Sequence, residues 1–132
     1  MAVVLDAQAV VAYLSEEPGG AMVRDLVVET TRQGEAVLMS VVNMAEVFYV
    51  IERKRGPDAA AALPAIFDVL AVQPVVADLE LARAAARLKA SNRMSLADCF
   101  AAALAKSSGG RLVTGDPDFE QVEGEIPIVW VR

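Results

Sequence analysis

The sequence predicts an α/β fold, a three-layer sandwich in which a five-stranded parallel sheet is flanked by helices. Short apolar runs alternate along the chain with longer segments of helical periodicity. Of all residues 55% are hydrophobic but only 5% are aromatic, and small side chains let helices pack closely on strands. A length of 132 residues is typical of one domain, so we expect a single domain over residues 1–132.

Five short apolar runs predict the strands, and the segments between them predict the helices. The strands are expected at residues 2–5, 36–39 with 41–42, 72–76, 112–114 and 127–131. The helices are expected at residues 9–14, 22–34, 43–55, 58–70, 78–90 and 95–106. Strands separated by one or two helices indicate a parallel sheet that is covered on both faces.

Capping and turn residues give the boundaries of several helices. Asn43 is expected to begin one helix, which ends at the basic residues 53–55. Pro64 is expected to kink or interrupt the next helix, because proline cannot donate a helical hydrogen bond. Ser95 is expected to begin the last helix, and the pair Gly109-Gly110 to end it.

The chain contains no histidine. A serine or cysteine nucleophile would therefore lack its usual base, and histidine-ligated zinc sites are excluded. The single cysteine, Cys99, cannot form an internal disulfide and is expected to be a buried apolar residue in a reducing compartment. We expect a cytoplasmic protein that does not enter membranes, because no apolar stretch or leader of the required kind is found.

Carboxylates remain as candidate catalytic groups, and four of them follow the predicted strands. Asp6 comes directly after the first strand, Asp116 lies two residues beyond the fourth, and Glu46 and Asp98 lie in first turns of helices. Ligands of open α/β sheets bind beyond the carboxyl ends of the strands. Clustered carboxylates repel one another unless a cation neutralises them, and oxygen ligands favour Mg²⁺ or Mn²⁺.

Helix capping is the alternative explanation for each of these acids. Anions near a helix N-terminus are stabilised by unpaired backbone N–H groups. Glu46 and Asp98 each lie three residues after a capping residue, as in a capping box, and Asp6 and Asp116 could themselves be N-caps. The residues alone leave both roles open.

Four segments resemble the PIN-domain nucleases, most closely the VapC-type toxins of bacterial toxin–antitoxin pairs. These segments are residues 3–7, 40–47, 95–99 and 112–119, and they span nearly the whole chain. The resemblance implies a Mg²⁺-dependent endoribonuclease (with Mn²⁺ as the other candidate ion) that cleaves RNA and is inhibited by a small antitoxin protein. It assigns an acidic quartet, which consists of Asp6, Glu46, Asp98 and Asp116. It also assigns Thr114 as a hydroxyl that supports the ligands and Asp118 as a further carboxylate.

The chain departs from the family pattern directly after Asp6. The family usually has a serine or threonine there, followed by another small polar residue, whereas this chain has Ala7 and Gln8. Hydroxyl groups behind metal ligands orient those ligands. The departure therefore predicts weaker metal binding without loss of the site.

Phosphate binding requires cations, and residues 81–93 contain four of them and no acidic residue. We expect Arg87, Lys89 and Arg93 to contact RNA. The alternative is a solvated helix face with a cationic C-terminal cap, which also applies to the basic residues 53–55. The net charge of −6 argues against a protein that covers nucleic acid with its whole surface.

Two other functions remain open on the residues alone. A Mg²⁺-dependent phosphatase would use Asp6 as a nucleophile, but such sites usually have a second aspartate where this chain has Gln8. A non-catalytic binding module would use an apolar surface to recognise a partner.

The mean hydropathy of +0.41 is high for so small a domain, so we expect exposed apolar surface, a homodimer and a groove for an amphipathic inhibitor helix. Two apolar stripes are candidates for this surface. They are Met22, Val23, Leu26 and Val27, and Phe48, Ile51 and Leu63.

Overall fold

In the computed structural model, which describes all residues 1–132, five strands form one parallel sheet. The strands are β1 (Val3–Leu5), β2 (Val37–Ser40), β3 (Val72–Val75), β4 (Arg111–Thr114) and β5 (Ile128–Trp130). Their order across the sheet is β3-β2-β1-β4-β5, and every neighbouring pair is parallel. The predicted five-stranded parallel sheet is confirmed, with β1 at its centre.

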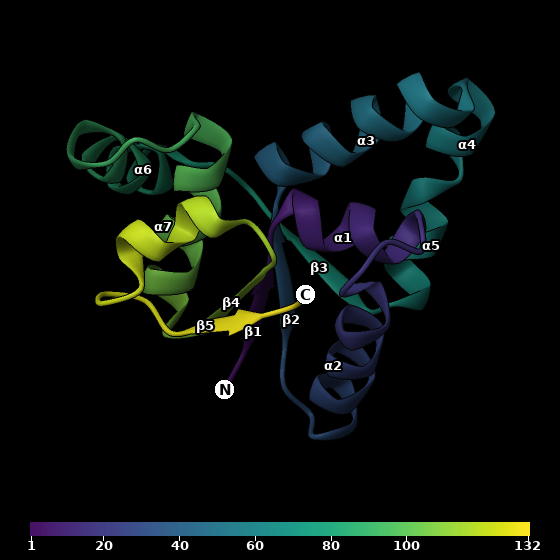
Figure 1. The fold of residues 1–132 in the computed structure, drawn as a ribbon, viewed down its shortest axis with the longest axis horizontal. Coiled ribbons are helices and arrows are strands. Elements are labelled where there is room, and N and C mark those ends of the chain that lie inside the picture. The colour runs from purple at the N-terminus through teal and green to yellow at the C-terminus, as the bar shows by residue number, and fades with distance from the viewer.

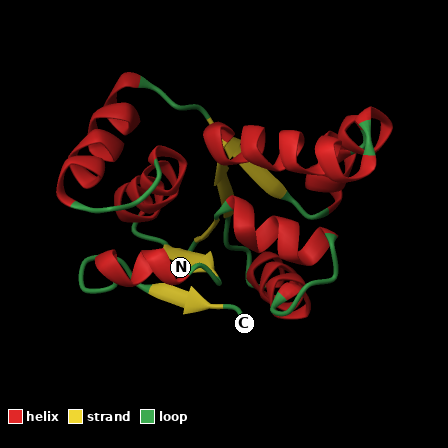
Figure 2. Ribbon diagram, turned by 45° about the horizontal axis from the view of Figure 1, so that its top comes forward, coloured by secondary structure: helices red, strands yellow, loops and turns green.

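Helices cover both faces of the sheet (Figure 1). One layer contains α1 (Ala7–Leu14), α2 (Gly20–Arg32), α3 (Val41–Arg55), α4 (Pro57–Ala61) and α5 (Leu63–Val69). The other contains α6 (Leu79–Ser91), α7 (Leu96–Ser108) and the short 3₁₀ helix η1 (Pro117–Val122). Figure 2 shows the strands between these two groups of helices, which confirms the three-layer sandwich.

Alternating side chains of the strands divide the interior into two apolar cores. Val3 and Leu5 of β1 belong to the core beneath α1 and α3, whereas Val4 belongs to the core beneath α7. In β4, Val113 belongs to the core beneath α1 and α3, and Leu112 to the core beneath α7. Because successive side chains of a strand point to opposite faces, each continuous apolar run supplies both cores.

The start of α3 differs from the prediction. The sequence predicts a strand up to Val42 and a helix from Asn43, but β2 ends at Ser40 and α3 begins at the next residue. The Ser40 hydroxyl accepts a hydrogen bond from the Val42 N–H at 3.2 Å, so Ser40 is the N-cap. The strand preference of valine is weak and depends on context, so the capping residue decides. Glu46 consequently lies in the second turn, and its capping explanation is wrong.

The predicted interruption at Pro64 is confirmed as a break between α4 and α5. Pro64 lies in the first turn of α5, where a missing N–H removes no helical hydrogen bond. The last helix, α7, also has its predicted ends, since Ser95 is its N-cap and Gly109 adopts the left-handed conformation after it.

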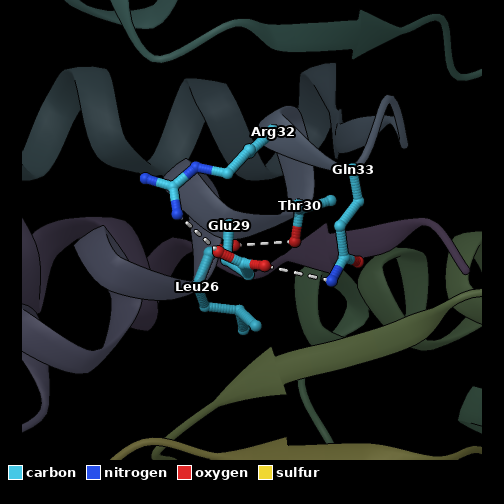
Figure 3. A network of polar contacts seen from close by, with 5 residues as sticks. All are labelled: Leu26, Glu29, Thr30, Arg32 and Gln33. Carbon is cyan, nitrogen blue, oxygen red and sulfur yellow. Dashed lines mark hydrogen bonds and ion pairs between the residues drawn. The ribbon is translucent and has the colours of Figure 1, made fainter.

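The C-terminal end of α2 is held by local polar contacts, which Figure 3 shows. The Thr30 hydroxyl donates to the Leu26 carbonyl at 2.7 Å. The Glu29 carboxylate accepts from Arg32 at 3.3 Å and from Gln33 at 3.1 Å. These contacts lie near the N-terminal ends of the strands, where β2 begins, and not near the carboxyl ends.

Most residues of the two candidate apolar stripes belong to the core. Val27 and Leu63 are 2% and 1% exposed, and the other core members of the stripes are Val23 and Ile51. Met22 of the first stripe is exposed. Apolar side chains and Tyr13 also line a hollow of about 390 Å³ between the end of α1 and α5, which includes Ile66 and Val69. None of the helices has the length and apolar character that crossing a membrane requires.

The close approach of α1 and α2 depends on Gly20. A Cβ atom at this position would lie 2.4 Å from the Ala12 carbonyl oxygen of α1. We therefore expect Gly20→Ala to lower the free energy of unfolding by about 1–3 kcal/mol, because the helices must separate. Chemical denaturation measures this change. Gly124→Ala is the control, since no atom lies within 4 Å of its added Cβ; equal losses in both variants would contradict the prediction.

Candidate metal centre

The carboxyl ends of β1 and β4 lie side by side at the centre of the sheet. The chain continues from β1 to β2 on one side of β1, and it returns from β3 to β4 on the other side. Such a reversal of strand order is the place where open α/β sheets form ligand sites. Asp6 follows β1 directly, and Asp116 lies two residues beyond β4.

Asp6 is almost completely buried, with 1% of its surface exposed. Its Oδ1 accepts a hydrogen bond from the Ala9 N–H at 2.8 Å, and its Oδ2 accepts one from the Thr114 hydroxyl at 2.6 Å. Burial, with a smaller contribution from the charges of Asp98 and Asp116, raises the pKa of Asp6 to about 7 in spite of these two bonds, which lower it. Asp6 is thus both the N-cap of α1 and a buried acid beside other acids.

Thr114 and Gln8 hold the turn that follows β4. The Thr114 hydroxyl, which donates to Asp6, also accepts from the Asp116 N–H at 3.0 Å. Gln8 Oε1 accepts from the Gly115 N–H at 2.7 Å. Gln8, at which the chain departs from the family pattern, therefore orients the turn that leads to Asp116. The sequence contains no local signal for this contact, because the two residues are 107 positions apart.

Three carboxylates form the closest group. Asp98, Asp116 and Asp118 each place one carboxylate oxygen within 4.8 Å of the others. The Asp98 N–H donates to the hydroxyl of the N-cap Ser95 at 3.1 Å, and Asp116 Oδ1 accepts from the Asp118 N–H at 2.9 Å as the N-cap of η1. Burial, followed by the charge of Asp116, raises the pKa of the half-buried Asp98 to about 6. The N-terminal caps of α7 and η1 thus help to hold the three carboxylates close together.

Glu46 approaches the group from α3. Burial and the charge of Asp116 raise the pKa of Glu46, although no Glu46 oxygen belongs to the closest group. Asn43, one turn before it, is buried and donates to the Ala97 carbonyl of α7 at 2.9 Å. The bond joins the helix of Glu46 to that of Asp98. The sequence does not predict it, because its local pattern makes Asn43 the expected N-cap of its helix.

The acids have no basic partner within the chain. None of the six ion pairs includes any of the five, which are Asp6, Glu46, Asp98, Asp116 and Asp118. Burial, and after it the charge of neighbouring carboxylates, raises the pKa values of Asp6, Glu46 and Asp98, because no cation compensates these charges. A set of carboxylate oxygens is also what Mg²⁺ and Mn²⁺ prefer. The residues present therefore fit a divalent cation.

The three basic residues expected to contact RNA differ in their surroundings. Arg93 lies in the connection between α6 and α7, bonded to η1 through Gln121. Lys89 Nζ donates to the Met94 carbonyl at 2.6 Å, which holds it against the same connection. Arg87 lines a hollow with Lys106 on the C-terminal half of α7, about 12 Å along that helix from its first turn. Arg93 is therefore the member of this set that is linked to the acids.

Comparison with known proteins identifies the family and the fold. The PIN domain family model matches residues 3–125, whereas no curated protein matches the sequence. VapBC2 from Rickettsia felis, solved with a promoter DNA fragment, has 14% identity and a TM-score of 0.75 over 100% of both chains. VapBC-5 from Mycobacterium tuberculosis has 25% identity and a TM-score of 0.61, covering 99% of this chain and 98% of that chain.

A third solved structure is similar over most of its length. VapC20 from Mycobacterium tuberculosis, described as a Sarcin-Ricin loop cleaving toxin, has 17% identity and a TM-score of 0.71 over 91% of this chain and 94% of that chain. These structures share the sheet and its covering helices with the present chain. The family model covers nearly the whole sequence and includes all five acids. The chain belongs to the PIN domain family.

Proposed function

We propose that this protein is a metal-dependent endoribonuclease and the toxin of a VapC-type toxin–antitoxin pair. The observation that carries the proposal is the group of acids without basic partners at the carboxyl ends of β1 and β4. Membership of the PIN domain family supports a nuclease. The similarity to a toxin described as cleaving the Sarcin-Ricin loop supports RNA as the substrate.

Asp98, Asp116 and Asp118 would hold Mg²⁺ or Mn²⁺, with Asp6 and Glu46 completing the negatively charged site. A bound ion of this kind activates a water molecule and neutralises charge on the scissile phosphate. The Thr114 hydroxyl bonds both the Asp6 carboxylate and the backbone of Asp116, and would orient these two acids toward a bound ion.

The phosphate groups of RNA would be bound by Arg93, with Lys89 beside the same connection and Arg87 extending the basic surface away from the acids. Because backbone phosphates lie at regular spacing, a cation beside the cleavage site and another farther along can engage successive nucleotides. The burial of Asp6 disfavours the phosphatase alternative, since a nucleophilic carboxylate must reach the phosphorus atom. Both Asp6 oxygens already accept hydrogen bonds.

Removing one negative charge from the site tests the assignment. We expect Asp98→Asn and Asp6→Asn to fold and to reduce Mg²⁺-dependent cleavage of single-stranded RNA by at least about 100-fold, since residues behind the ligands alone contribute about 10- to 100-fold. Cleavage is measured with Mg²⁺ and with EDTA, alongside a phosphate-ester substrate. Asp68→Asn, an exposed acid of α5, is the control. Full activity in the site variants, with unchanged metal binding by calorimetry, would refute the assignment.

The raised pKa values predict how the stability of the metal-free protein depends on pH. The pKa of Asp6 is about 7 in the fold against an ordinary 3.8, so the folded state binds an extra proton between these values. The free energy of unfolding therefore falls as pH rises through this range. The raised pKa of Asp98 also lowers it as pH rises. We expect a lower Tm in EDTA at about pH 8 than at about pH 5, a smaller difference in Asp6→Asn, and recovery with Mg²⁺ at the higher pH. A Tm that rises with pH in EDTA would contradict this.

We also propose a homodimer and a small antitoxin partner that seats an amphipathic helix in the apolar hollow between α1 and α5. Light scattering should give the mass of a dimer, and the protein encoded beside this chain should bind it and lower its ribonuclease activity. Val69→Glu should weaken that complex, because Val69 is 86% exposed in the hollow. Val28→Glu, on α2, is the matched control. Complexes of equal affinity would remove the hollow from the interface.

A further inference from the structure

The side-chain amide of Gln121 in η1 is bonded to both backbone polar groups of Arg93. Gln121 Oε1 accepts from the Arg93 N–H at 2.7 Å, and its Nε2 donates to the Arg93 carbonyl at 3.1 Å. A side-chain amide that pairs with both groups of one residue restrains that residue as a neighbouring strand would. The two residues are 28 positions apart, so the contact joins separate elements.

The same amide is also tied to the acids. Gln121 Nε2 donates to the Asp118 carbonyl at 3.0 Å, and Asp118 belongs to the closest group of carboxylates. One side chain thus links the backbone of an acidic residue to the backbone of a basic one. No ion pair or side-chain hydrogen bond involves the Arg93 guanidinium, so its charge is free to meet a ligand.

The other side-chain contacts of this connection do not reach η1. Asn92 Nδ2 donates to the Leu88 carbonyl at 3.0 Å, and Lys89 Nζ donates to the Met94 carbonyl, so both tie the connection to α6. Gln121 is the side chain that ties it to the turn of Asp116 and Asp118. Loss of its amide would leave the connection attached to α6 but free to move relative to the acids.

We propose that Gln121 is a positioning residue that holds Arg93 beside the carboxylates, so that the Arg93 guanidinium binds an RNA phosphate next to the cleavage site. The proposal rests on the ribonuclease function proposed above. Gln121 itself does not contact substrate; it acts through the position of Arg93. Its loss should therefore weaken substrate binding more than it slows the chemical step.

A double-mutant cycle between Gln121 and Arg93 tests this proposal. We expect Gln121→Ala to raise the KM for single-stranded RNA about fivefold, as the loss of one or two positioning hydrogen bonds implies, with kcat changed less than about twofold. Gln121→Met, which keeps the side-chain length but cannot bond, should behave in the same way. Adding Gln121→Ala to Arg93→Ala should have no further effect, because the group that it positions is then absent.

RNA binding in EDTA gives a readout that does not depend on cleavage. Arg93→Ala should reduce the salt dependence of binding by about 0.7 in the logarithmic slope, the value for one phosphate contact to a single strand, and Gln121→Ala should reduce it toward the same value. Gln33→Ala is the matched control, because Gln33 is an exposed glutamine whose amide bonds only within the end of α2 (Figure 3).

The outcomes separate the two proposals. A wild-type protein that does not cleave RNA would overturn the proposed function and this inference with it. An active wild-type protein with unchanged KM and salt slope in Gln121→Ala and Gln121→Met would overturn the inference alone. Additive losses from Gln121→Ala and Arg93→Ala would also overturn it, because they would show that Gln121 acts independently of Arg93.

Discussion

The hydrogen bond from the Thr114 hydroxyl to the Asp6 carboxylate is the contact on which the geometry of the site depends. It joins the end of β4 to the end of β1 across 108 positions of sequence. The same hydroxyl accepts from the Asp116 N–H, so one side chain sets the relation between the first acid and the turn that bears two others. The parallel pairing of β1 and β4 makes this bond possible, because it aligns the carboxyl ends of the two strands.

The arrangement has an energetic consequence for the protein without metal. Burial and mutual repulsion raise the pKa values of Asp6, Asp98 and Glu46, so their charged forms are destabilised in the fold. Two apolar cores and the caps of α1, α7 and η1 hold these side chains in place in spite of that repulsion. Helix capping and metal binding, which are alternatives in the sequence, are therefore compatible in the structure. The N–H groups that satisfy a capping carboxylate also orient it.

The sequence by itself determined much of the architecture. Alternating apolar runs and helical stripes predicted the five strands and the helices between them, because strand and helix periodicities are local properties. Ser95 predicted the start of α7, and Pro64 predicted the break before α5, because caps and proline breaks are also local signals. The start of α3 was predicted wrongly, because two valines after Ser40 have the composition of a strand and a serine cap was a competing local signal.

Only the tertiary structure decided which acids meet and what holds them. Asp118 joins Asp98 and Asp116 more closely than Asp6 or Glu46 does, and this depends on how η1 packs against α7. The contacts of Gln8 with Gly115 and of Gln121 with Arg93 join residues that are 107 and 28 positions apart. Local patterns in one sequence carry no information about such pairs. A side-chain amide finds its partner only when the strand order and the packing of the helices have brought the two segments together.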